Sequence, residues 1–258
     1  MGEIGFLILG IATGILSGLF GIGGGIIMVP SLIMIFGMNI LDANAASLTS
    51  MLLPVGILGV ITYYKAGMIN VKDSLLLAAG LFLGSFFGGE FAVNMSESFL
   101  TKLYAGILLY IAISYFDIPS YFKKKKEANQ SEKITNLQKP FFIYVLIGIA
   151  AGIFAGLFGK GGGIIIIPML IGILHYNPKA AAATSLAALQ LPVGLPSVII
   201  YAQNGHLNII AAAFIAIGII AGTFWGSKIG MKLPSSIFKK VFGMFLIIVA
   251  IYMAYKYV

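Results

Sequence analysis

Long apolar runs separated by short polar connections fill this chain from end to end. The apolar runs cover residues 3–20, 24–38, 43–64, 73–93 and 99–117, and then 140–158, 162–176, 180–202, 208–230 and 237–257. A helix needs about 20 apolar residues to cross the hydrocarbon core of a bilayer, so many of these runs can span it. The pattern predicts an all-α membrane protein of about ten transmembrane or re-entrant helices, with five segments on each side of a polar connection.

The composition agrees with this prediction. Hydrophobic residues make up 60% of the 258 residues and charged residues 9%, and the mean hydropathy is +1.04, which excludes a water-soluble globular protein. The absence of Cys excludes thiolate metal sites and thiol catalysis. All 16 basic residues are Lys, and most lie between apolar runs. We therefore expect the lipid bilayer as a partner and no nucleic acid.

The polar connection divides the chain into three parts. Residues 118–139 are charged and lack apolar periodicity, so they are predicted to form a solvated linker. Residues 1–117 and 140–258 then form a first and a second membrane repeat. The start of the chain lacks the basic region of a cleaved signal, and Phe6 stands where a myristoylation motif has Ser or Thr, so neither processing event is expected.

The two halves of the chain repeat each other at an offset of 138 residues. Residues 14–30 and 152–168 are identical at 12 of 17 positions, and the register continues through four segments. We call two residues at this offset mates. The mates include Ser47 and Ser185, Pro54 and Pro192, Gly56 and Gly194, Tyr63 and Tyr201, and the glycine ladders 80, 84, 88 and 218, 222, 226. The alignment indicates an internal duplication.

The lysines between segments indicate how the halves are oriented. If every segment crosses the membrane, one face holds 13 lysines, including Lys65, Lys72 and those of the linker, and the other holds 3. If the first two segments of each half form one broken crossing, the division is 9 against 6, with Lys160 inside the membrane. Cytoplasmic loops carry the excess of Lys, which favours the first count. We therefore expect two inverted repeats in the cell membrane, with the linker cytoplasmic and both termini outside.

Each half contains a glycine loop before its second segment. The loops place Gly23, Gly24 and Gly25 in the first half and Gly161, Gly162 and Gly163 in the second, and Pro30 or Pro168 follows in a short segment. Such segments are predicted to be re-entrant or broken, with helices restarting after Gly25 and Gly163. Glycine permits positive φ and leaves N–H groups open, so the two helix starts would suit a small anion. The alternative is that the glycines form tight turns at the membrane surface.

These motifs resemble a known family. The duplicated glycine motif with its downstream proline, the Ala-Thr-Ser-Leu run at 183–186 and its weaker copy at 46–49 resemble the sulfite exporter TauE/SafE family over the whole chain. The resemblance implies a carrier of small anions, chiefly sulfite, sulfonates and related sulfur compounds, driven by an ion gradient. The first copy has Ala46 where the second has Thr184, so a hydroxyl contribution there rests on Ser47 and Thr49.

Several polar residues are candidates for substrate binding. Ser47, Thr184 and Ser185 lie near helix starts, where a hydroxyl either caps the backbone or faces a ligand. Gln190 is an amide in an apolar run, so it must contact either a substrate or the backbone freed by Pro192. Lys160 lies inside the second glycine loop, where it would either attract an anion or extend to water.

The sequence predicts a secondary active transporter of small anions, with sulfite, organosulfonates or related sulfur compounds as the expected cargo, working by alternating access at a midplane site between the repeats. A proton or sodium ion is expected as the coupling ion, although no proton-coupling acid is evident, and no cofactor or metal is expected. A passive anion channel is the alternative. An intramembrane enzyme is disfavoured because no catalytic motif appears in the apolar segments. The glycine ladder at 80, 84 and 88 predicts packing within one chain, with a homodimer face as the alternative.

Overall fold

The computed structural model describes residues 2–20, 24–107, 140–159, 162–176 and 178–230, and every regular element in these ranges is a helix. The all-α prediction is therefore confirmed for the described residues. The chain forms a larger unit from Met1–Asn94 and Lys133–Met231 and a smaller one from Met95–Glu132 and Lys232–Val258. Of the smaller unit, residues 95–107 are described and are helical from residue 97. The predicted linker and the segment at 237–257 lie outside the described residues.

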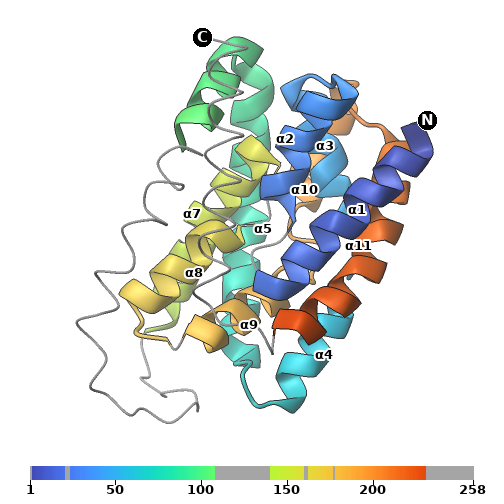
Figure 1. The fold of residues 1–258 in the computed structure, drawn as a ribbon. Coiled ribbons are helices and arrows are strands. Elements are labelled where there is room, and N and C mark those ends of the chain that lie inside the picture. Colours follow the sequence, from blue (N-terminus) through green and yellow to red (C-terminus); the bar gives the residue numbers. More distant parts are fainter. Residues whose placement is uncertain (1, 21–23, 108–139, 160–161, 177, 231–258) are drawn as a thin grey trace. The chain divides into compact units, whose positions relative to one another are not determined.

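Ten helices of the larger unit follow the order of the sequence repeat (Figure 1). The first half contains α1 (Gly2–Phe20), α2 (Gly25–Phe36), α3 (Ile40–Ser50), α4 (Ile57–Lys65) and α5 (Val71–Asn94). The second half contains α7 (Phe141–Phe158), α8 (Gly163–Gly172), α9 (Pro178–Ala188), α10 (Leu195–Gln203) and α11 (Ile209–Gly230). The offset of 138 residues places each helix of the first half on a helix of the second.

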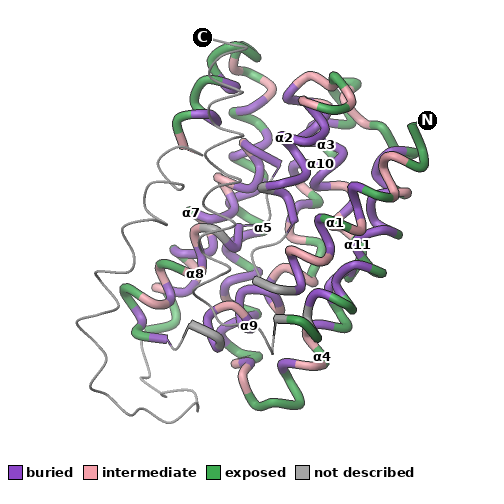
Figure 2. Tube along the Cα trace, in the orientation of Figure 1, coloured by how far each residue is buried: buried purple, intermediate pink, exposed green. Residues whose placement is uncertain are grey.

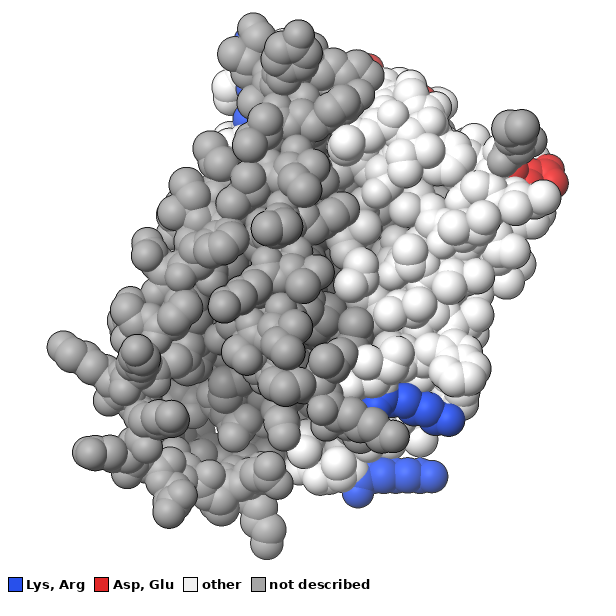
Figure 3. Space-filling view, in the orientation of Figure 1, with Lys and Arg blue, Asp and Glu red and all other residues white. Residues whose placement is uncertain are grey.

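Three of the described helices are long and apolar enough to cross a membrane. They cover Val71–Asn94, Phe141–Phe158 and Ile209–Gly226, whereas Gly2–Gly18 of α1 is a shorter apolar stretch. The outer faces of these helices carry exposed phenylalanines such as Phe82, Phe86 and Phe141, and Figure 2 shows the exposed and buried sides alternating along them. In Figure 3, charged residues of the described part lie toward the upper and lower ends, and uncharged residues cover the area between them. This surface suits lipid contact.

The long helices pack in pairs through glycine. A Cβ added at Gly10 of α1 would lie 2.4 Å from the carbonyl oxygen of Ile215 in α11, and one at Gly14 would lie 2.5 Å from that of Ile219. Because residue numbers rise together along both helices, α1 and α11 are parallel. This pair therefore joins the first helix of one half to the last described helix of the other, at a separation that only glycine permits.

The mate pair, α5 with α7, repeats this packing. A Cβ at Gly80 would lie 2.2 Å from the carbonyl oxygen of Val145, and one at Gly84 would lie 2.1 Å from that of Ile149. The α5 and α7 helices are therefore also parallel. The prediction that the glycine ladder packs within one chain is confirmed, since backbone of the same chain covers these glycines.

The third segment of each half is broken, at a place that the sequence analysis did not name. In the run 43–64, α3 ends at Ser50 and α4 begins at Ile57, and in the run 180–202 α9 and α10 are separated in the same way. Pro54 and Pro192 lie in these breaks, where a proline lacks the N–H that would continue the helix. The prolines therefore end the helices.

The second segments begin where the sequence analysis placed them. The α2 helix starts at Gly25 and α8 at Gly163, and their lengths of 12 and 10 residues are too short to cross a bilayer. The expected positive φ is wrong for Gly24 and Gly162, which have φ of −63° and −58°. It occurs instead at Gly159, with φ of 62°, where a Cβ would lie 2.4 Å from the Cα of Asn44. The left-handed turn thus ends α7 and precedes the loop.

Candidate functional site

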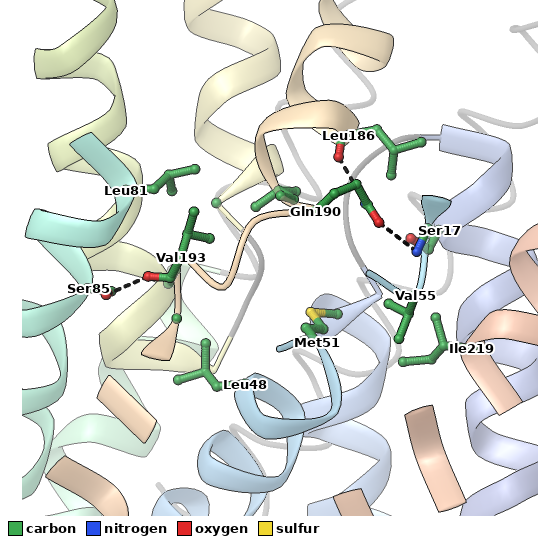
Figure 4. A pocket seen from close by; sticks show the side chains of 15 residues that line it. Ser17, Leu48, Met51, Val55, Leu81, Ser85, Leu186, Gln190, Val193 and Ile219 are labelled. Carbon is green, nitrogen blue, oxygen red and sulfur yellow. Dashed lines mark hydrogen bonds between the residues drawn. The ribbon is translucent and has the colours of Figure 1, made fainter. Parts of the chain in front are cut away.

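A cavity lies where the two broken segments meet (Figure 4). The empty space between its walls is about 600 Å³ when the solvent on its open side is included. The breaks between α3 and α4 and between α9 and α10 supply much of the wall. The lining residues are Ser17, Leu48, Met51, Val55, Gly56, Leu81, Ser85, Ala155, Gly162, Leu186, Leu189, Gln190, Val193, Gly194 and Ile219.

The lining is built from matching positions of the two halves. Twelve of the fifteen residues form six pairs of mates: Ser17 and Ala155, Leu48 and Leu186, Met51 and Leu189, Val55 and Val193, Gly56 and Gly194, Leu81 and Ile219. Both halves therefore contribute the same elements to the cavity. Equivalent positions of the two halves therefore lie around one cavity.

Gln190 makes the two sides of the cavity different. Its Oε1 accepts a hydrogen bond of 2.8 Å from the N–H of Gly56, and its Nε2 donates one of 3.0 Å to the carbonyl oxygen of Leu186. Its mate, Leu52, cannot make the equivalent bonds. Among the described residues, the N–H of Gly194 accordingly has no acceptor. In the cavity wall, the N–H of Gly56 is thus occupied by the Gln190 side chain, whereas the N–H of its mate Gly194 is open.

Two helix N-termini meet at the cavity. Gly56 and Gly194 are the residues at the N-terminal caps of α4 and α10, and neither cap is closed by a side chain of its own. The first N–H groups of a helix lack intrahelical acceptors and carry partial positive charge. Aliphatic residues form most of the surrounding wall, so these dipoles act in a poorly polarisable environment that strengthens electrostatic attraction. The arrangement favours a small anion.

Serine hydroxyls contribute in different ways. The Oγ of Ser85 donates a hydrogen bond of 2.7 Å to the carbonyl oxygen of Val193, and Ser197 donates to the carbonyl oxygen of Ser85. These bonds hold the break between α9 and α10 against α5, so the Ser85 hydroxyl is already used. Ser17 of α1 also lines the cavity, and the described residues offer its hydroxyl no hydrogen-bond partner. Ser17 can therefore serve a ligand.

The glycine loops contribute less of the described wall than the sequence analysis expected. Gly162 lines the cavity, whereas Gly24, Gly25 and Gly163 are buried outside its lining. A Cβ at Gly24 would lie 1.9 Å from the Cγ2 of Thr13, so this glycine permits close packing of α1 and α2. Gly23, Lys160 and Gly161 lie outside the described residues.

The predicted hydroxyl residues are buried but do not line the cavity. The Oγ of Ser47 donates a hydrogen bond of 2.5 Å to the carbonyl oxygen of Gly159, at the end of α7. The Oγ1 of Thr184 accepts a bond of 3.5 Å from the N–H of Asn70. The Oγ of Ser185 is buried and finds no partner in the described part of the chain. Ser47 thus supports the backbone that leads into the second glycine loop.

Sequence reasoning missed the residues of the two breaks. Met51, Val55, Gly56 and Gly194 line the cavity, and none of them was a candidate. A signal was present, since each proline in the third segments is followed two residues later by a glycine and both pairs are mates. A proline removes a helical N–H and a glycine lowers the barrier to leaving the helix. The pair in a long apolar run therefore predicts an interruption.

Discontinuous helices around a cavity between two related halves, within an apolar all-helical chain, are the architecture of a membrane transport protein. The sulfite exporter TauE/SafE family matches residues 6–253, and the chain belongs to this family. It is 31% identical to a probable membrane transporter protein of Methanocaldococcus jannaschii over 91% of this chain and 87% of the relative. It is 29% identical to a probable membrane transporter protein of Haemophilus influenzae over 97% of both chains. No solved structure matches it.

Proposed function

We propose that this protein is a secondary active transporter of small sulfur-containing anions, such as sulfite or an organosulfonate, that works by alternating access. The observation that carries the proposal is the cavity between the halves, where the N-termini of α4 and α10 meet and the Gly194 N–H is open. The anion binds at these backbone donors and at Ser17. The sulfur chemistry rests on the name of the family alone.

Inverted repeats are part of the proposal, and the helix directions support them. In Figure 1, α1 descends from the N label, whereas α5 ascends from its connection to α4. Because α5 and α7 are parallel, α1 and its mate helix α7 run in opposite directions. When the halves are inverted, the cavity opens to one side of the membrane in one conformation. If the two halves exchange their conformations, the cavity opens to the other side.

The charge of the lining supports an anion as the substrate. The fifteen lining residues include neither Asp nor Glu, so the described wall has no carboxylate to repel an anion or to hold a cation. Lys160 follows Gly159 in the second glycine loop, whose Gly162 lines the cavity. We therefore keep the glycine loops, Lys160 and Ser185 as proposed substrate-binding residues, together with the residues of the two breaks.

The orientation in the membrane is also proposed. The excess of lysines places the linker in the cytoplasm, both termini outside and the connection between α4 and α5, with Lys65 and Lys72, on the cytoplasmic side. A coupling ion, a proton or sodium, must bind the inward and outward states differently for a gradient to drive the cycle.

Transport by the purified protein in liposomes tests the proposal. Radiolabelled sulfite should enter protein-containing vesicles saturably, and unlabelled sulfite or sulfoacetate inside the vesicles should accelerate entry by exchange. Exchange distinguishes a carrier from a passive channel, because a channel gives no acceleration by substrate on the far side. If entry is linear in concentration and indifferent to internal anion, the channel alternative is correct. If the vesicles take up none of the sulfur anions or carboxylates offered, the proposed function is wrong.

A further inference from the structure

Asp73 is a buried carboxylate in a chain where acids are rare. Its residue is 7% exposed, whereas the other described acids, Glu3, Asp42, Glu90 and Glu97, are exposed or partly exposed. Asp73 lies in the first turn of α5, where its N–H donates a hydrogen bond of 3.2 Å to the Oδ1 of Asn70. The sequence analysis did not single it out and found no proton-coupling acid evident.

The groups that face Asp73 come from the other half of the chain. Tyr176, in the segment after α8, donates its hydroxyl hydrogen to the Oδ2 of Asp73. Tyr144 of α7 lies in the same buried cluster as Tyr176. The carboxylate is therefore held by the Tyr176 hydroxyl across the boundary between the halves.

No cation balances this carboxylate in the part of the chain that the structure describes. Lys72, on the same helix, is exposed, and so is His175 beside Tyr176. The buried residues of α9 near the site are Ala180 and Ala181, and the side chain of Lys179 at the start of α9 lies outside the described residues. The tyrosine of α10, Tyr201, donates to the carbonyl oxygen of Gly156 instead. Burial of a carboxylate costs free energy, and binding a proton removes that cost.

We propose that Asp73 is the binding site of the coupling ion and that this ion is a proton. The proposal rests on the transport function proposed above. A proton here bonds to one carboxylate oxygen and converts Asp73 to the neutral acid, with no other bond made or broken.

Protonation of Asp73 changes the contact between the halves. A neutral acid accepts a weaker hydrogen bond than a carboxylate, so the bond from Tyr176 weakens when the proton binds. This bond joins the start of α5 to the segment between α8 and α9, and it must break if these elements separate on that side of the cavity. The proton therefore favours opening on the side of Asp73, which supplies the difference in affinity between states that coupling requires.

A second contact between the halves provides a matched control. Asp42, at the start of α3, lies 2.8 Å from the Nδ1 of His206, which follows α10. The Asp42 contact joins α3 of the first half to the connection after α10 of the second half. The Asp73 contact joins α5 of the first half to the connection after α8 of the second half. Its side chains are more accessible, with exposed fractions of 37% for Asp42 and 22% for His206, so the charges are partly solvated.

Asp73→Asn separates coupling from transport. Asparagine has the size of aspartate and still accepts a bond from Tyr176, but it does not titrate. Accumulation of radiolabelled sulfite under a pH gradient is divided, for each protein, by its own exchange rate at equal pH. We expect this ratio to rise with the gradient for the unchanged protein and for Asp42→Asn, and not to rise for Asp73→Asn. The species of sulfite present are the same in all three samples, so they do not affect the comparison.

Infrared spectroscopy tests proton binding without any transported anion. The pH-difference spectrum of the unchanged protein minus that of Asp73→Asn should contain the C=O band of a protonated carboxylic acid, because the other seven acids are present in both proteins and cancel. Absence of the band from this double difference, or normal pH-driven accumulation by Asp73→Asn, would overturn the proposal. Accumulation driven by sodium would overturn it as well. If sulfite is not transported, the function proposed above fails for sulfite, and the infrared result still decides the proton site.

Discussion

The open N–H of Gly194 can be tested by removing that single hydrogen-bond donor. Gly194 has φ of −85°, near the range of proline, so Gly194→Pro deletes the N–H, and the ring also shifts Val193 in the turn that the N–H of Leu195 closes on the carbonyl oxygen of Pro192. A hydrogen bond to a charged group contributes about 1.5 to 3 kcal/mol. Its loss should therefore weaken sulfite binding and raise the dissociation constant by about 10-fold to 150-fold.

Gly194→Ala is the matched control for this change. Alanine keeps the N–H, and its Cβ would lie 3.1 Å from the Cδ2 of Leu48, the end of a flexible side chain that can shift slightly. We expect Gly194→Ala to bind sulfite nearly as the unchanged protein does. The measurement is isothermal titration calorimetry on purified protein, with a melting curve of each variant to show that it is folded.

Two outcomes would refute the reasoning about Gly194. Equal affinities of folded Gly194→Pro and Gly194→Ala for sulfite would show that the N–H does not bind the anion. The second outcome uses Gln190→Leu, which copies Leu52 and releases the N–H of Gly56. We expect this variant to bind sulfite more tightly, because a second donor becomes free. Weaker binding would mean that the cavity uses Gln190 itself.

Three further predictions concern packing and topology. Gly84→Ala should destabilise the protein by about 1 to 3 kcal/mol in a melting experiment, because its Cβ would lie 2.1 Å from a carbonyl oxygen of α7, whereas Gly106→Ala enters open space and should be neutral. Asn44→Ala should cost about 1 to 3 kcal/mol, because the Asn44 Nδ2 donates a bond of 2.8 Å to the end of α7. The chain has no Cys, so single cysteines report topology. In whole cells an impermeant thiol reagent should label Ser96→Cys but not Ser131→Cys, and the reverse pattern would contradict the proposed orientation.

The sequence by itself determined the features that depend on local chemistry. Apolar runs predicted the helical membrane class, because a bilayer requires long stretches of apolar helix with internal hydrogen bonds. The duplication gave the correspondence of the two halves, and glycines gave the starts of α2 at Gly25 and α8 at Gly163. The breaks at Pro54 and Pro192 were also within reach of the sequence, since the missing N–H of proline is a local property.

Only the tertiary structure decided which of these elements meet. Periodicity along one segment does not reveal that α1 packs on α11 and α5 on α7, because that choice depends on backbones more than 60 residues apart in the chain. The same is true of the bond between Gln190 and Gly56, which leaves Gly194 open. Asp73 is likewise hydrogen-bonded by Tyr176 of the other half. Local rules give each residue its conformation, whereas contacts between distant segments determine which polar groups remain unpaired, and these groups define the site.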